Sequence, residues 1–431
     1  MTLSHMLSAP TRRRQWILVA LLVAAGCVNY IDRSTLAIAN HEISTELHLS
    51  PSQMGLLLSA FAWVYAIFQL PAGVLTDRFG PRVMLAAGMT LWSAAQIISG
   101  LVTGFGQFLV ARGGLGFGES PMFTAGARAC VDWFPARDRG FPLGLFNAAS
   151  SLGPAIAPPL LTALMLAFGW RPMFVVMGFA GLVVAVTWGL YYRSPEAAGT
   201  PSDDIEAIRA GNDQDTIGTG MMGWTKLFTV PTTWALMGGL FGIVYVTWLY
   251  VAWLPDYLET VRHVSVARTG TLAAIPQFAG FVGGCLGGVI SDRLVSRGGD
   301  PVASRKYPIV AGLLLAALLT SIAPFALTTT WVLVLMSSAM FCAYGAGSCS
   351  WALGTALTPP SMVATLESVQ NIGGSIGGAL APLVTGLVIQ HTGSFNPAFI
   401  AGAVIAALSA GSYALVSGSA YDRLFRALGT R

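Results

Sequence analysis

The stretch Gly73-Val74-Leu75-Thr76-Asp77-Arg78 recurs in the second half of the chain as Gly288-Val289-Ile290-Ser291-Asp292-Arg293. Each copy follows an apolar run about 20 residues long, the length that crosses the hydrocarbon core of a bilayer as a helix. The two copies therefore connect helices of the same orientation, and the chain is predicted to contain two parallel repeats.

A second pair of matching segments supports the repeat. It lies in the fifth and eleventh apolar runs, where Asn147, Ser151, Gly153, Ala155, Ala157 and Pro158 recur as Asn371, Ser375, Gly377, Ala379, Ala381 and Pro382. Membrane proteins built from two such halves bind their ligand near mid-membrane and rock the halves to alternate access.

Composition excludes the soluble classes of protein. Of the 431 residues, 54% are hydrophobic and only 10% are charged, whereas a soluble domain carries about 25% charged residues. The chain is therefore predicted to be an all-α, polytopic membrane protein. The five cysteines lie in apolar runs without the spacing of metal ligands, so we expect no metal and no cofactor.

Twelve transmembrane helices are predicted from the apolar runs and their Gly, Pro and charged boundaries. They lie near residues 16–40, 53–75, 83–103, 106–128, 139–166, 170–192, 230–257, 267–291, 307–326, 330–356, 361–390 and 395–417. The only long polar stretch separates the sixth from the seventh. The predicted organisation is a six-helix bundle at 1–192, a cytoplasmic linker at 193–228 and a second six-helix bundle at 229–431.

Basic residues predict the orientation of these helices. With both termini inside, the inner segments hold most of the 23 lysine and arginine residues, and the outer loops hold only Arg171, Arg262 and Arg268. The positive-inside rule therefore places both termini in the cytoplasm.

Several segments resemble known transporters. The loop from Gly73 to Arg82 resembles the signature loop of the major facilitator superfamily, and Arg112 with the glycines after it resembles a second motif of that superfamily. Three further segments resemble the anion:cation symporters, which include bacterial galactonate, glucarate and hexuronate transporters and the vesicular glutamate and sialic-acid carriers. These are Asn29-Tyr30-Ile31-Asp32-Arg33, Phe61-Ala62-Trp63-Val64-Tyr65 and Phe117-Gly118-Glu119-Ser120-Pro121.

The resemblance implies proton-coupled uptake of an organic anion, most simply a sugar acid such as an aldonate, aldarate or hexuronate, across the inner membrane of a bacterium. It also implies a monomer, while the scarcity of charged residues already excludes a nucleic-acid partner. Carried over by motif, Asp32 and Glu119 match protonation sites of the family, and Tyr65 matches a tyrosine of the substrate site.

Four ionisable residues fall inside the predicted spans of the first half: Asp32, Arg33, Arg112 and Glu119. Such residues are expensive in hydrocarbon and usually functional. Two acids and two bases sum to zero, so a bound carboxylate leaves one negative charge in excess, which a proton on Asp32 or Glu119 removes. We expect Arg33 and Arg112 to hold the anions of this network, one of them facing the substrate. The alternative is that the four charges only tie the first and fourth helices together.

The second half carries polar and aromatic candidates instead. Gln277, Trp351, Gln370 and Asn371 are expected to line a central cavity, and by resemblance Trp351 and Asn371 contact substrate, as does Ser150 of the first half. Packing roles for Trp351 and Asn371 remain the alternative.

The repeated Asp-Arg loops are predicted to act as gates. Asp77, Arg78, Asp292 and Arg293 would pair in one access state and separate in the other. Glu367, one turn before Asn371, is interpreted as an inner-gate or capping carboxylate, and a second coupling site is the alternative.

Other functions stay open at this point. An exchanger of organic anions without net proton movement, a carrier of an aromatic or dicarboxylic acid, a non-transporting sensor and a channel each remain alternatives. An enzyme is not expected, because no nucleotide-binding loop, zinc motif or hydrolase motif occurs.

Overall fold

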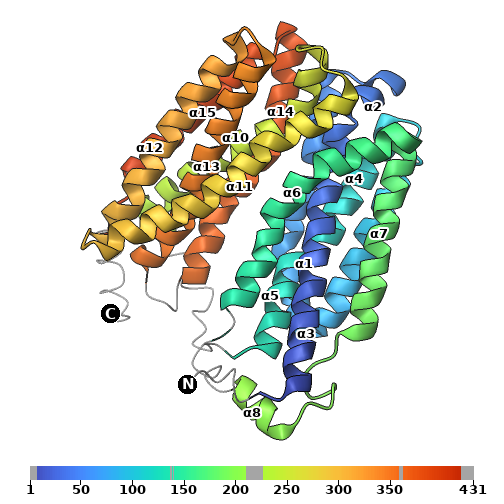
Figure 1. The fold of residues 1–431 in the computed structure, drawn as a ribbon, viewed down its shortest axis with the longest axis vertical. Coiled ribbons are helices and arrows are strands. Elements are labelled where there is room, and N and C mark those ends of the chain that lie inside the picture. Colours follow the sequence, from blue (N-terminus) through green and yellow to red (C-terminus); the bar gives the residue numbers. More distant parts are fainter. Residues whose placement is uncertain (1–6, 136–137, 139, 210–226, 359–362, 419–431) are drawn as a thin grey trace. The chain divides into compact units, whose positions relative to one another are not determined.

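The computed structural model describes residues 7–135, 138, 140–209, 227–358 and 363–418, and these residues form helices and loops without a strand (Figure 1). The expected all-α class is therefore confirmed. Part of the predicted linker, residues 210–226, lies outside the described residues.

The first helices of the chain are α1 (Ala9–Ile38), α2 (Asn40–Glu46), α3 (Pro51–Ser99), α4 (Phe105–Glu119), α5 (Met122–Trp133), α6 (Gly140–Phe168), α7 (Trp170–Tyr191) and α8 (Ser202–Arg209). The second part contains α10 (Pro231–Thr260), α11 (Val266–Ser296), α12 (Pro301–Ile322), the short 3-10 helix η3 (Ala323–Phe325), α13 (Thr329–Leu357), α14 (Val363–Thr392) and α15 (Asn396–Ala414). Ten helical segments of the described chain are long and apolar enough to cross a membrane.

The two remaining predicted spans are also helical, but each departs from the simple expectation. The span near 83–103 is the second part of α3, where buried Ser93, Gln96 and Ser99 interrupt the apolar run. The span near 106–128 is not one helix: α4 ends at Glu119, and α5 begins at Met122. Pro121 lacks the N–H that a continuous helix would need.

The loop with the first copy of the repeated motif, Gly73 to Arg82, interrupts α3. Gly80 has φ 77° and ψ 161°, a backbone conformation that only glycine adopts readily. Pro81 follows directly and starts the next helical segment, where its missing N–H costs nothing. The Asp77 motif therefore ends one predicted span and leads into the next by a sharp turn.

Contacts divide the chain into two compact units, Met1–Leu36 with Ala60–Gly218, and Ala37–Ser59 with Thr219–Arg431. In the second unit α10 packs along α14, α11 along α13, and α12 along α13 and α15 (Figure 1). The segment Ala37–Ser59 joins this unit because the start of α3 packs on α14, with the Ser52 backbone N–H donating to Gln390 at 3.2 Å. The bundle boundaries predicted from sequence stay a prediction.

The internal repeat reappears as a repeated helix contact. A Cβ on Gly153 of α6 would overlap Tyr30 of α1, and a Cβ on Gly377 of α14 would overlap the carbonyl of Phe241 of α10. These glycines are equivalent in the sequence repeat, so the fifth span packs on the first as the eleventh packs on the seventh. Small residues permit such close approach in lipid, where no hydrophobic effect drives helices together.

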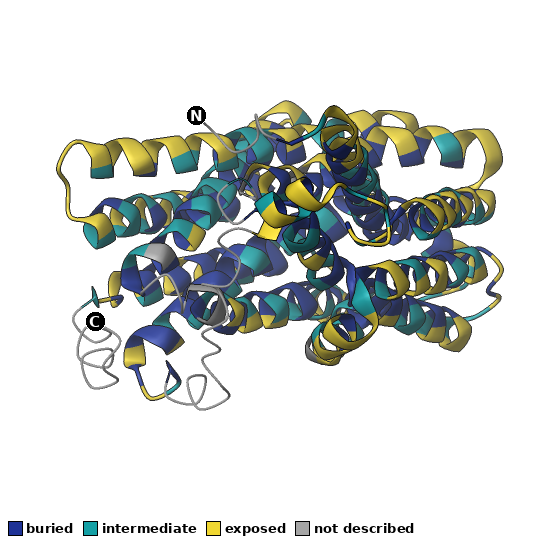
Figure 2. Cartoon of the chain, turned by 90° about the horizontal axis from the view of Figure 1, so that it is seen from below, coloured by how far each residue is buried: buried dark blue, intermediate teal, exposed yellow. Residues whose placement is uncertain are grey.

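Within each unit, buried and exposed residues lie on different faces of the helices. Figure 2 shows buried residues on the helix faces turned toward the interior of a bundle and exposed residues on the faces turned away. Many exposed side chains are large and apolar, among them Val110, Leu190 and Leu315, as expected for surfaces that contact lipid.

The close approach of α11 and α13 gives a prediction with a matched control. A Cβ on Gly283 would overlap the Phe341 carbonyl, whereas no described atom lies within 4 Å of a Cβ on Gly288 of the same helix. We expect Gly283→Ala to lower the free energy of unfolding by about 1–3 kcal/mol and Gly288→Ala to leave it nearly unchanged. Thermal unfolding in detergent measures both, and equal stability of the two variants would contradict the packing account.

A second prediction concerns the start of α1, outside the membrane-spanning segments. The Asp204 carboxylate of α8 accepts hydrogen bonds from the Ser8 backbone N–H at 3.1 Å and from the Thr11 hydroxyl at 2.6 Å. Burial of Asp204 raises its pKa, but the hydrogen bonds from Ser8 and Thr11 outweigh burial and leave the pKa below its ordinary value. The ionised carboxylate thus acts as a helix cap supplied from the linker.

We expect Asp204→Asn to lower the free energy of unfolding by about 1 kcal/mol at neutral pH, with Asp203→Asn, an exposed neighbour, as the control. A carboxyl group whose pKa is lower in the folded than in the unfolded protein stabilises the fold at pH values above its unfolded-state pKa. The difference in stability between Asp204→Asn and the wild type is therefore fully present at pH 7. It disappears as the pH falls through the lowered pKa of Asp204. Unfolding midpoints measured against pH test this, and an unchanged difference in acid would refute it.

Candidate functional site

Four ionisable side chains gather inside the first unit, two from α1 and two from α4. Asp32, Arg112 and Glu119 have no exposed surface, and Arg33 is 8% exposed. Asp32 and Arg33 are neighbours near the end of α1, while Arg112 and Glu119 are seven residues apart and share one face of α4. Glu119 is the last residue of α4, directly before the break at Ser120 and Pro121.

Arg33 and Glu119 form an ion pair between the two helices. The Arg33 Nε donates to Glu119 Oε2 at 2.6 Å. The guanidinium lies over three aromatic rings, at 4.7 Å from the centroid of Tyr30, 5.2 Å from Phe61 and 5.0 Å from Tyr65. The rings hold the guanidinium by cation–π attraction and exclude water around it.

Asp32 and Arg112 are buried without hydrogen bonds. Neither carboxylate oxygen of Asp32 and no guanidinium nitrogen of Arg112 has a hydrogen-bond partner among the described residues. Arg112 lies over the Phe61 ring at 5.2 Å and acts electrostatically on both Asp32 and Glu119. Buried polar groups are rarely left unsatisfied, so this pair offers free capacity for a proton and for an anion.

Other groups of the first unit extend this set. The Tyr65 ring lies over Arg33, as described, and Ser150 of α6 lies beside the Tyr30 hydroxyl group. Asn29, one turn before Arg33, is fully buried, and both polar atoms of its amide lack a hydrogen bond within the described chain. The structure thus brings together five residues predicted for the site, namely Asp32, Arg33, Tyr65, Arg112 and Glu119. Ser150 is connected to them through Tyr30.

In the second unit Gln370 belongs to a buried polar chain. Its amide Nε2 donates to the Ser350 hydroxyl at 2.7 Å, and Ser350 shares a short hydrogen bond with the Tyr413 hydroxyl. Trp351 is 43% exposed on α13, Asn371 is half-buried on α14, and Gln277 is buried on α11. The amide nitrogen of Gln370 is therefore already engaged in a hydrogen bond within the second unit, whereas Trp351 and Asn371 have accessible surface.

Glu367 lies in the same region of the second unit. Its carboxylate packs against Gly354 of α13, where a Cβ would overlap it. Both carboxylate oxygens are buried, and neither has a hydrogen-bond partner in the described part of the chain. Glu367 therefore caps no described backbone group.

The residues proposed as gates are exposed. Asp77 is 75% exposed and lies 3.5 Å from Arg128 Nη1 of α5, and Arg128 also pairs with Asp132 at 2.9 Å. Arg78 lies over the Phe79 ring, and Asp292 and Arg293 are exposed at the end of α11. The Asp77–Arg128 contact links the loop inside α3 to α5 within one unit.

Sequence reasoning assigned no role to Tyr30, Phe61, Ser350 and Tyr413. The spacing of Phe61 and Tyr65, one helical turn apart, could have indicated a shared aromatic face. Ser350 and Tyr413 lie 63 residues apart, and no local pattern links them.

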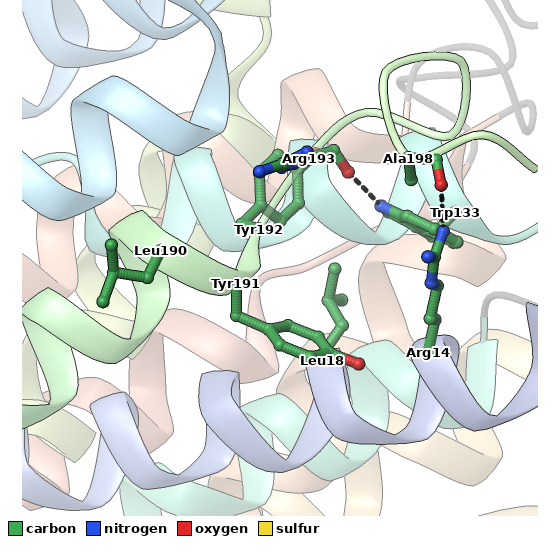
Figure 3. Close-up of a pocket in the computed structure, with 8 residues that line it drawn as sticks. All are labelled: Arg14, Leu18, Trp133, Leu190, Tyr191, Tyr192, Arg193 and Ala198. Atoms are coloured by element: carbon green, nitrogen blue, oxygen red, sulfur yellow. Dashed lines mark hydrogen bonds between the residues drawn. The ribbon is translucent and has the colours of Figure 1, made fainter.

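A separate pocket of about 230 Å³ lies at the start of α1, lined by Arg14, Leu18, Trp133, Leu190, Tyr191, Tyr192, Arg193 and Ala198 (Figure 3). Trp133 Nε1 donates to the Arg193 carbonyl at 3.1 Å, and Arg14 donates to the Ala198 carbonyl. The residues at 193–198 are thereby attached to α1 and α5. The pocket contains none of the four buried ionisable residues.

Known proteins with similar sequences include transporters of sugar acids. A probable L-galactonate transporter of Escherichia coli (strain K12) is 40% identical over 94% of this chain and 90% of its own. The probable galactarate/D-glucarate transporter GarP of the same strain is 33% identical over 90% of each chain. A hexuronate transporter of Bacillus subtilis (strain 168) is 30% identical over 89% of this chain and 90% of its own.

A solved structure shares the fold. It is a bacterial homolog to the human lysosomal transporter Spinster in an inward-facing and occupied conformation, with a TM-score of 0.78. The match covers 98% of this chain and 99% of the other at 22% identity, so it supports the fold alone. Residues 22–382 match the sequence model of the Major Facilitator Superfamily. With that match and relatives similar over nearly their whole length, the chain belongs to the Major Facilitator Superfamily, whose members are membrane transporters and not enzymes.

Proposed function

We propose that this protein carries a sugar-acid anion together with a proton by alternating access. The named relatives transport galactonate, galactarate or glucarate, and hexuronates, and the matches extend over nearly the whole chain. Organic anions of this class are therefore the substrates we assign to the chain, with L-galactonate as the first probe.

The observation that carries the proton-coupling proposal is the charge balance of Asp32, Arg33, Arg112 and Glu119. All four are buried, and their formal charges cancel. An isolated excess charge in such surroundings costs several kcal/mol. A bound carboxylate adds one negative charge, and one proton restores neutrality, so the anion and the proton favour each other's binding.

Asp32 is the best acceptor for that proton. Both its oxygens lack a hydrogen-bond partner among the described residues, so protonation costs no hydrogen bond there, and the charge of Arg112 is the main influence against it. Glu119 already accepts a hydrogen bond from Arg33. If the substrate carboxylate takes Arg33 from Glu119, the charge count is unchanged, and Glu119 becomes an alternative acceptor for the same proton.

The arginines are suited to bind the substrate carboxylate. Arg33 retains a free Nη2, and it is the one member of the four with exposed surface. A planar guanidinium can bind a carboxylate with two parallel hydrogen bonds. The Tyr65 ring beside it, with Ser150, Gln370, Trp351 and Asn371, would contact the hydroxyl groups and carbon chain of the sugar acid.

The exposed charges of the two repeated loops would act as gates. Asp77, Arg78, Asp292 and Arg293 would stabilise one access state by pairing differently in the two states. The protein would work as a monomer in the inner membrane of a bacterium, with both termini in the cytoplasm according to the distribution of basic residues.

Neutralising Asp32 should separate uphill transport from exchange. In proteoliposomes with an inward proton gradient, we expect Asp32→Asn to lower the accumulation of L-galactonate at least tenfold, because the substitution removes the coupling carboxylate. Counterflow exchange, which needs no net proton movement, should be retained. The control Asp203→Asn removes an exposed carboxylate of α8 and should behave as the wild type.

The same measurement decides between the proposal and its alternatives. Wild-type uptake that ignores the pH gradient would indicate an anion exchanger. Undiminished uphill uptake in both Asp32→Asn and Glu119→Gln would refute coupling through the buried charges and support a purely structural role for them.

A further inference from the structure

Glu367 is a further buried carboxylate, in the second unit and remote in sequence from the charged set of the first. It lies on α14 one turn before Asn371, and its carboxylate packs on Gly354 of α13. Both oxygens are removed from solvent and have no hydrogen-bond partner within the described ranges of the chain. An ionised carboxylate in this setting would have neither water nor a donor to stabilise it.

The helices packed around Glu367 carry almost no compensating charge. The sequences of α13 and α15 contain no charged residue. Apart from Glu367, the ionisable residue of α14 is His391. His391 is 24 residues further along the helix, about 36 Å away by helical rise. Tyr413 of α15 interacts electrostatically with Glu367, but the Tyr413 hydroxyl shares its hydrogen bond with Ser350.

Neighbouring helices supply charges that are already engaged or distant. On α10, Asp256 and Glu259 lie near the opposite end, because α10 runs alongside α14 with Phe241 against Gly377. Lys306 of α12 donates to the carbonyls of Ala414 and Val416 at 3.2 and 3.1 Å.

The charges near Cys349 do not reach Glu367 either. Arg305 of α12 and Asp292 of α11 act electrostatically on Cys349 of α13, and Arg293 is exposed at the end of α11. Among the described residues, none of these cations forms an ion pair with Glu367. Its surroundings therefore favour the neutral, protonated form.

The nearby amide strengthens the case for a carboxyl group that changes its protonation. Gln370 lies three residues after Glu367, and its Oε1 has no hydrogen-bond donor among the described groups, while its Nε2 donates to Ser350. Residues three apart share a helix face, so the free Oε1 of Gln370 is a candidate acceptor for an acid proton of Glu367. The Glu367 side chain as a whole is half-buried.

We propose that Glu367 binds a second proton, which is carried with the anion and released from the second unit. This inference rests on the proposed function and adds to it: the first unit neutralises the anion with one proton, and Glu367 contributes another. Transport of a singly charged sugar acid then moves one net positive charge inward.

The test measures accumulation driven by voltage alone. Proteoliposomes hold the wild type, Glu367→Gln or the control Glu206→Gln, which removes an exposed carboxylate of the linker helix α8. L-Galactonate is supplied at equal pH on both sides with an inside-negative potential of about 118 mV. For one net charge, at 59 mV per tenfold, this potential supports about 100-fold accumulation.

We expect accumulation in the wild type and in Glu206→Gln, and none in Glu367→Gln. A proton gradient without voltage should still drive Glu367→Gln, because Asp32 and Glu119 are intact. Glu367→Gln that responds to voltage as the wild type does would overturn the inference, as would a wild type driven by the proton gradient but indifferent to voltage. A wild type that accumulates nothing under either gradient would overturn the proposed function itself.

Infrared spectroscopy covers the case in which Glu367→Gln folds but does not transport. At neutral pH the purified wild type should show a protonated carboxyl band that Glu367→Gln lacks and Glu206→Gln retains. Identical carboxyl bands in all three proteins would overturn the inference.

Discussion

The structure of the first unit depends on one electrostatic constraint: buried charges must cancel. Asp32, Arg33, Arg112 and Glu119 are enclosed by helices, where water cannot stabilise an excess charge. The Arg33–Glu119 pair satisfies this constraint by direct contact, whereas Asp32 and Arg112 satisfy it only by proximity. The second pair is therefore the part of the set whose charge state can change at the smallest cost in hydrogen bonds.

Helix packing brings these charges together. Gly116 of α4 lies against the backbone of Phe61 in α3, so that the Phe61 ring reaches both arginines. The break after Glu119 ends α4 at the level of Arg33. The second unit has a close contact between the corresponding spans, where Gly283 of α11 lies against the backbone of Phe341 in α13, but it carries Glu367 with mostly neutral groups around it. The two units thus share a packing pattern and differ in charge.

Much of this arrangement could be predicted from the sequence, because hydrocarbon limits the choices. The apolar runs, the repeated Asp77 and Asp292 motifs and the four rare charges all follow from what a bilayer tolerates. The helix break at Pro121 was missed because proline does not by itself end a membrane helix: α6 and α10 continue through Pro154 and Pro255. The Arg33–Glu119 pairing and the Ser350–Tyr413 contact depend on how distant helices pack, which local periodicity does not encode. The isolation of Glu367 likewise became visible only when its neighbours were known.

The central claim is that anion and proton bind together, and proton uptake on binding tests it most directly. Purified wild-type protein in weakly buffered detergent solution is titrated with L-galactonate while a pH indicator counts protons. The account predicts uptake of about one proton per bound anion, with an affinity that falls about tenfold per pH unit where that uptake occurs. Binding without proton uptake, and with an affinity independent of pH from about 5 to 9, would contradict it.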